Sequence, residues 1–87
     1  MPTLRFTARI RNGGSAPLGL QVEPWGEYYR IEPGAFADIQ AEGPGLDAGE
    51  GSGLLKIEHA PELVTVYAWS GAMFTVVGAE PAPWPEK

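Results

Sequence analysis

The sequence predicts an all-β protein, a seven-stranded antiparallel β-sandwich, and three observations lead to that class. Apolar and polar residues alternate in several short runs, which is the pattern of strands with one buried face. Gly and Pro, 12 and 9 of the 87 residues, separate these runs. No run shows the three- and four-residue apolar spacing of a helix. The segments that fit a strand are residues 3–11, 18–23, 27–32, 35–42, 54–59, 63–69 and 72–79.

Residues 18–34 organise this prediction, because they read as two strands joined at Pro24-Trp25-Gly26. Period-two alternation puts one set of their side chains on the buried face. That set is Leu18, Leu20, Val22, Tyr29 and Ile31. Pro33-Gly34 fits positions i+1 and i+2 of a type II turn. We therefore expect this turn to close a second hairpin, onto residues 35–42.

The flanking segments complete the two predicted sheets. The nine residues 3–11 alternate without interruption, and segments 12–17 and 70–71 contain residues typical of hairpin turns. In residues 35–42 the inward positions hold small alanines beside Ile39. We expect Trp25 or Tyr29 to fill the space opposite them.

The chain is expected to form one domain at residues 1–79, since 87 residues leave no room for a second core. A glycine-rich acidic stretch at 43–53 is predicted to be a mobile loop that separates two hairpin groups. Prolines alternate through residues 80–87, which predicts an extended tail without ladder hydrogen bonds.

Charge and composition restrict the partners. The net charge of −5 opposes binding to a phosphate backbone, so we expect no nucleic-acid partner. Arg5, Arg9 and Arg11 share one face of the first strand, where we expect them to pair with acidic residues on a neighbouring strand. A small anion-binding or nucleic-acid stripe is the alternative. No signal-peptide pattern or long apolar run is seen, so a cytoplasmic protein without a membrane partner is expected.

No catalytic or metal-binding constellation is recognisable. Cysteine is absent and His59 is the one histidine, which excludes thiolate and multi-histidine metal sites. Ser70 lacks any nucleophile motif that would support pairing with His59. Acidic residues around the second hairpin are typical of a solvated strand face. We therefore predict a non-enzymatic protein without a cofactor.

The aromatic residues are the remaining candidates for function. Core packing is the simplest role for Trp25, Tyr29 and Trp69. An exposed aromatic face would mark a partner or ligand site. The candidate contact residues are Trp25, Tyr28, Tyr67, Trp69 and Trp84. They favour a protein-interaction or self-association module. The alternative is a small-ligand or carbohydrate-binding module that uses exposed aromatic rings.

Two resemblances accompany this interpretation. IRNGGSAPLGLQVEPWG, IEPG and VTVYAW resemble motifs of a group of small uncharacterised bacterial all-β proteins. That resemblance implies a cytoplasmic β-sandwich of no known activity, and it assigns no functional residue. More loosely, Asn12, Ser15, Pro17 and the Pro33-Gly34 turn are similar in order to the von Hippel–Lindau β-domain.

Overall fold

The computed structural model describes residues 3–45 and 51–83, and the regular structure in those residues is all β, as predicted. Eight strands are present in the described residues, rather than the seven expected, because a short additional strand forms near residue 80. The strands are β1 (Thr3–Arg11), β2 (Leu18–Glu23), β3 (Glu27–Ile31), β4 (Phe36–Pro44), β5 (Lys56–Ala60), β6 (Leu63–Tyr67), β7 (Met73–Val77) and β8 (Glu80–Pro81).

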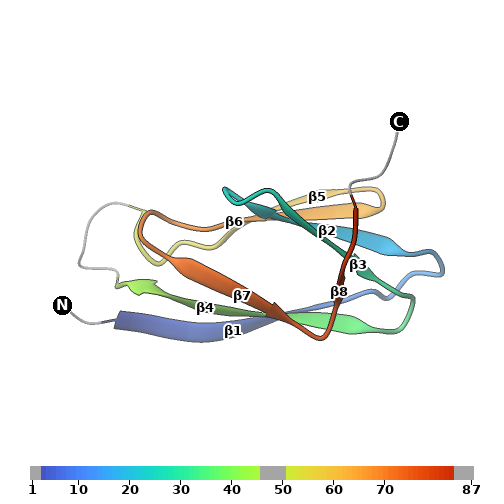
Figure 1. The fold of residues 1–87 in the computed structure, drawn as a ribbon, viewed down its shortest axis with the longest axis horizontal. Helices are drawn as coiled ribbons and strands as arrows, with labels where there is room; N and C mark the ends of the chain where they lie inside the picture. The colour runs from blue at the N-terminus through green and yellow to red at the C-terminus, as the bar shows by residue number, and fades with distance from the viewer. Residues whose placement is uncertain (1–2, 46–50, 84–87) are drawn as a thin grey trace.

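The strands form two sheets, which Figure 1 shows as separate layers. Sheet A is three-stranded with the order β1-β4-β7, and sheet B is five-stranded with the order β5-β6-β2-β3-β8. The pairing of β1 with β4 is continuous from Thr3↔Pro44 to Arg11↔Phe36. The central strands are therefore β4 in sheet A and β2 in sheet B.

The expectation of purely antiparallel sheets is wrong in one place, because β2 and β6 run parallel. Their register runs from Gly19↔Leu63 to Glu23↔Tyr67. Pairing also crosses the stretch 43–53, since β4 pairs with β7 and β2 with β6. The predicted division into two hairpin groups is therefore wrong. Alternation along one strand indicates which face is buried but contains no information about strand direction.

Three of the predicted hairpin turns connect the two sheets instead. Segment 12–17 leads from β1 in sheet A to β2 in sheet B, and segment 32–35 leads from β3 back to β4. Residues 68–72 likewise lead from β6 to β7. The β2–β3 hairpin is confirmed. Gly34 has a φ of 80°, as a type II turn requires. The predicted turn residues are therefore right, but the turn leads to the other sheet and does not close a hairpin.

Asn12 joins two of these crossing segments. Its side chain is buried and donates from Nδ2 to the carbonyls of Ala16 (2.8 Å) and Ile31 (2.9 Å). Its Oδ1 accepts from Gly14 N–H at 2.9 Å. Its backbone also bonds to Gly34 and Ala35 in the second crossing segment. Asn12 thus links the segment that follows β1 to the segment that follows β3.

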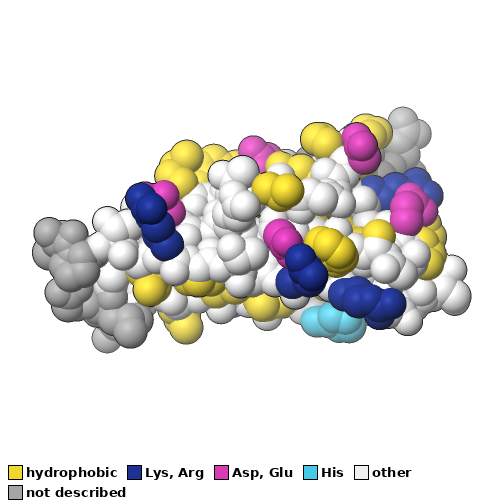
Figure 2. Space-filling view, turned by 90° about the horizontal axis from the view of Figure 1, so that it is seen from below, with side chains coloured by type: hydrophobic (Ala, Val, Ile, Leu, Met, Phe, Trp, Pro, Cys, Tyr) yellow, Lys and Arg dark blue, Asp and Glu magenta, His cyan; other side chains and the backbone are white. Residues whose placement is uncertain are grey.

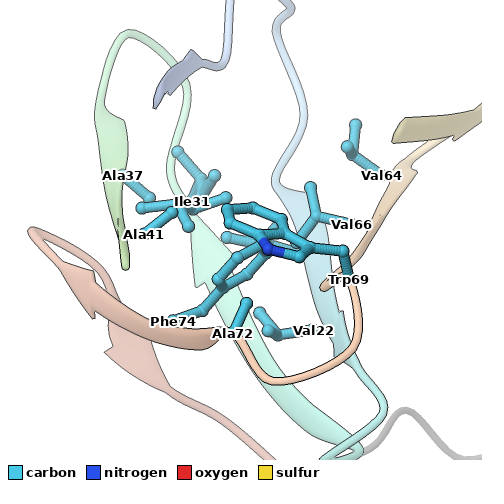
Figure 3. Packing of buried hydrophobic residues seen from close by; sticks show 11 residues of the cluster. Val22, Ile31, Ala37, Ala41, Val64, Val66, Trp69, Ala72 and Phe74 are labelled. Carbon is cyan, nitrogen blue, oxygen red and sulfur yellow. The ribbon is translucent and has the colours of Figure 1, made fainter. Parts of the chain in front are cut away.

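The core lies between the sheets and draws on both. Figure 3 shows the indole of Trp69 among smaller side chains of the cluster. Trp69 stacks on Phe6 at a centroid distance of 5.8 Å and meets Phe74 edge-on at 5.9 Å. A Cβ on Gly43 would lie 2.7 Å from Ala72 Cα and 3.2 Å from this indole, so the glycine makes room for the backbone at Ala72 as well as for the ring. The buried apolar residues are Leu20, Val22, Ile31, Ala37, Ile39, Ala41, Val64, Val66, Trp69, Ala72 and Phe74.

Trp69 is therefore the large ring inside the core, and neither Trp25 nor Tyr29 has that place. Its indole N–H donates to the carbonyl of Pro44 at 3.0 Å, which satisfies its polar atom in the core. The β6 strand ends at Tyr67, so the alternation of β6 does not extend to residue 69.

Two segments expected to be irregular belong partly to the sheets. Gly43 and Pro44 are the last residues of β4, whereas residues 46–50 of the predicted loop lie outside the described residues. In the predicted tail, Glu80 and Pro81 pair with Arg30 and Tyr29 of β3. Ala82 N–H also donates to the carbonyl of Tyr28 at 2.9 Å. The tail prediction is therefore wrong at residues 80–82.

Replacing Asn12 with alanine tests its role. The substitution removes three side-chain hydrogen bonds and leaves a buried carbonyl of Ile31 without its donor. We expect the free energy of unfolding to fall by about 3 kcal/mol, measured by urea denaturation. Ser15→Ala, in the same segment but exposed, is the control and should change it by less than about 0.5 kcal/mol. Equal effects of the two substitutions would contradict the role of Asn12.

Candidate functional site

The outer face of sheet B carries a group of uncharged side chains that we call the tyrosine face. The register places Gln21 of β2 between Thr65 of β6 and Tyr28 of β3. Tyr67 lies two residues further along β6, beside Glu23. Facing residues in a sheet lie on the same side, so both tyrosines project from one surface. The tyrosine face consists of Gly19, Gln21, Tyr28, Leu63, Thr65 and Tyr67.

Tyr67 is held in place by its neighbours on β5. Its hydroxyl donates to Glu58 Oε1 at 2.8 Å, and Lys56 Nζ lies 4.9 Å from its ring centroid. The hydrogen bond to Glu58 is the main reason that the pKa of Tyr67 is raised. The ring is half-buried and has charged groups on its β5 side.

Tyr28 lies across the backbone of β2. A Cβ added to Gly19 would come within 2.9 Å of Tyr28 Cζ, so only glycine allows this position of the ring. An aromatic side chain over a glycine on a neighbouring strand covers backbone that would otherwise be exposed. Tyr28 therefore has a structural role that the sequence did not reveal, and its half-buried ring is fixed on the sheet.

A shallow hollow of ≈ 340 Å³ adjoins Tyr28 at one end of the tyrosine face. Its volume is near the lower limit for pockets that hold small ligands. Arg30, one of the residues in its wall, forms an ion pair with Glu32 at 2.7 Å. The lining residues are Pro17, Leu18, Gly19, Tyr28, Arg30 and Glu62.

The five candidate contact residues are not all brought together. Tyr28 and Tyr67 share the tyrosine face, whereas Trp25 lies in the β2–β3 turn, 40% exposed, with its ring 5.9 Å from that of Phe74. Trp69 is 7% exposed and belongs to the core rather than to an exposed aromatic face. Trp84 lies outside the described residues. The structure thus leaves two tyrosines on one surface and one partly exposed tryptophan at the turn.

Several residues of this site were not identified from the sequence. Gln21 and Thr65 are neighbours only because β2 and β6 run parallel, a long-range pairing. Leu18 and Glu62 meet at the hollow for the same reason. Tyr28 and Tyr29 are adjacent in a strand, so their side chains point to opposite faces, and this was the local signal that one ring points outward. It could not indicate which other residues share its face.

The arginines of β1 form the ion pairs expected of a solvated strand face. Arg9 bonds to both carboxylate oxygens of Asp38, at 2.8 and 3.0 Å, and Arg5 lies 3.1 Å from Glu42. The hydrogen bonds from Arg9 lower the pKa of Asp38. Arg11, by contrast, forms no ion pair with any of the described residues. The predicted pairing is confirmed for two of the three arginines.

Within residues 3–45 and 51–83, no group of three or more His, Asp or Glu side chains is arranged to hold a metal ion. His59 is exposed on β5 and lines a second hollow of ≈ 340 Å³ together with Arg11 and Ser15. Ser70 is not among the residues that line it. The described chain also has no helix long and apolar enough to span a membrane.

No protein-family model, curated protein or solved structure matches this chain. The two family resemblances noted above therefore remain predictions. The candidate site rests on its own geometry.

Tyr29 provides a spectroscopic test of the packing on the inner side of β3, opposite the tyrosine face. Burial and a hydrogen bond of 2.8 Å to Glu27 raise its pKa to about 12, above the usual value of about 10. Because the folded pKa is raised, the neutral phenol contributes stability that is complete below pH 10 and is lost as the pH rises towards 12. Absorbance at 295 nm should show a tyrosine ionising near pH 12.

Tyr29→Phe should remove this late ionisation and reduce the loss of stability above pH 10. The same substitution leaves the tyrosine face unchanged, because Tyr29 lies on the opposite side of β3 from Tyr28. A late ionisation that persists in Tyr29→Phe would contradict the described surroundings of this phenol.

Proposed function

We propose that this chain is a non-enzymatic β-sandwich protein that binds another protein through the tyrosine face. The main support is the distribution of residue types over the outer surface of sheet B. The centre is uncharged and contains two tyrosines. Charged residues surround it: Lys56 and Glu58 on β5, Glu23 at the end of β2, and Arg30 and Glu80 beyond Tyr28. Protein interfaces typically have an aromatic centre without charges and a charged rim.

The two tyrosines also suit a contact surface energetically. A tyrosine fixed before binding loses little conformational entropy when a partner covers it. Glu58 and Lys56 hold Tyr67, and the contact with Gly19 fixes Tyr28. The hollow beside Tyr28 offers a place for one side chain of the partner. Such a ring-and-pocket pair is the usual form of a binding hot spot.

The size of the face favours a second protein species over a permanent dimer. The tyrosine face spans β6, β2 and β3. Three strands about 4.8 Å apart and about 17 Å long give a flat area on the order of 250 Å². Stable complexes bury roughly 800 Å² on each partner, and permanent dimers bury more. The tyrosine face is therefore suited to a transient complex with a dissociation constant in the micromolar range.

Site-specific photo-crosslinking tests the proposal. A photoreactive phenylalanine analogue at position 67 should crosslink a partner protein in cells. The same analogue at position 75 is the control, because Thr75 is exposed on sheet A.

The crosslinked partner protein is then purified, and its affinity for this chain is measured by calorimetry. Tyr67→Ala should weaken binding about thirtyfold, the loss that corresponds to a hot-spot residue. Thr75→Ala should change it less than twofold.

Three results would contradict the proposal. The first is the absence of a crosslink specific to position 67. The second is a crosslink only to a second copy of this chain. The third is a purified partner whose affinity is the same for Tyr67→Ala and the unaltered chain. Circular dichroism confirms that each variant is folded before its affinity is compared.

A small-ligand or carbohydrate-binding module is a second candidate, favoured by the hollow beside Tyr28. The ring at its edge supplies an aromatic surface against which a sugar packs, and Arg30 supplies hydrogen-bond donors. Saturation-transfer NMR with a panel of sugars distinguishes the two functions. Saturation-transfer signals of a sugar that disappear in Tyr28→Ala support a carbohydrate-binding module. The absence of saturation transfer from the protein to any sugar of the panel excludes a binding module for those sugars.

A further inference from the structure

No strand of the described residues lies beside the outer edge of β1, the edge away from β4. Among the described strands β1 pairs only with β4, and it does so over nine residues without a bulge or proline. Natural proteins usually shorten, bend or cover such an edge, because its free N–H and C=O groups pair readily with another chain. The β1 edge is long and is not shortened, bent or covered by a described strand. Its outward arginines disfavour pairing with a strand of like charge, so it is a site for the addition of a strand of opposite charge.

The hydrogen-bond pattern assigns the free backbone groups to particular residues. Asn12 N–H donates to Ala35, which continues the β1–β4 ladder beyond Arg11↔Phe36. Successive residues of an antiparallel strand direct their backbone groups to opposite edges. The backbone N–H and C=O groups of the even-numbered residues of β1 therefore point towards β4. The residues whose N–H and C=O groups face the open edge are Thr3, Arg5, Thr7, Arg9 and Arg11.

The side chains along this edge determine the charge of the strand that fits it. The outward residues of β1 are arginine or threonine, and the acidic partners of Arg5 and Arg9 lie on β4, on the other side. A second copy of β1, paired antiparallel about Thr7, would place Arg5 opposite Arg9 of that copy. Like charges directly opposite each other are destabilising, whereas carboxylates at these positions are favourable.

The inward side chains of β1 are apolar, with Leu4, Phe6 and Ile10 packed against the core, and an exposed apolar residue lies on the edge strand of the other sheet. On β5, the edge strand of sheet B, Ile57 is 53% exposed although it pairs with the buried Val66. Facing residues share a side of the sheet, so Ile57 points towards the core side but remains uncovered. His59 also lies on this side and shares a hollow with Arg11 of β1. In Figure 2, seen from the sheet A side, the histidine lies at the margin of the face beside Lys or Arg side chains.

We propose that the β1 edge binds an extended acidic segment of another protein by strand addition. The segment places carboxylates opposite Arg5, Arg9 and Arg11 and turns its alternate apolar side chains towards Ile57. This site is separate from the tyrosine face and does not depend on its function. The net charge of −5 repels an acidic peptide, so its binding must arise from the local arginines of this edge.

A synthetic nine-residue peptide of alternating Glu and Val, capped at both ends and labelled with fluorescein, is the probe. Fluorescence anisotropy should show saturable binding that weakens as salt is added. The matched peptide with Lys in place of Glu should not bind. Arg11→Glu should weaken binding at least tenfold and leaves both ion pairs of β1 intact. Thr75→Ala and Tyr67→Ala should bind as the unaltered chain does.

Amide hydrogen exchange by NMR locates the peptide. Bound peptide should slow exchange at the amides of Arg5, Thr7 and Arg9 at least tenfold and should leave the even-numbered amides of β1 unchanged. Three results would overturn the proposal: no binding of the Glu peptide, equal binding of the Lys peptide, or protection elsewhere than on the β1 edge. A loss of binding in Tyr67→Ala would also overturn it, because that result would place the peptide on the tyrosine face.

Discussion

The hydrogen bonds of Asn12 are the constraint on which the arrangement of the two sheets depends. This buried side chain bonds to Ala16 and Ile31, and its backbone bonds to Gly34 and Ala35. These bonds hold two segments that pass between the sheets, so they set how β1 and β4 lie relative to β2 and β3. A buried amide with satisfied hydrogen bonds favours one arrangement strongly, because alternatives leave its polar atoms unpaired.

The crossing segments also explain why the tyrosine face exists. Because the chain changes sheets after β1, β3, β4, β6 and β7, residues from its two halves become neighbours within sheet B. The parallel pairing of β2 with β6 then places Gln21 beside Thr65 and brings Tyr28 and Tyr67 onto one surface. The core lies on the other side of these strands, so the half-buried Gln21, Tyr28 and Tyr67 are available for contact without loss of packing, whereas Thr65, 7% exposed, is covered by its neighbours.

The sequence predicted the elements better than their assembly. Strands, buried faces and turns follow from local chemistry: the alternation in β1, the positive φ of Gly34 and the β2–β3 hairpin were all predictable. The sequence did not predict which strands the turns connect, since the same turn residues occur in hairpins and in segments that cross between sheets. Core packing was the simplest role predicted for Trp69, but it was also a candidate contact residue, because it follows the end of β6, where alternation no longer separates inward from outward positions. Of the candidate site, the outward direction of Tyr28 was predictable, but its glycine neighbour and the hollow were not.

The parallel pairing of β2 with β6 is the central claim, since the composition of the tyrosine face depends on it. Disulfide trapping tests it most directly. The double variant Gln21→Cys with Thr65→Cys should form a disulfide on mild oxidation, because paired residues lie within the distance that the bond spans. Glu23→Cys with Leu63→Cys should not, because in the parallel register these residues are offset by four positions, about 13 Å. Trapping of the second pair, with or without the first, would contradict the parallel arrangement, because an antiparallel pairing about Gln21 and Thr65 brings Glu23 opposite Leu63.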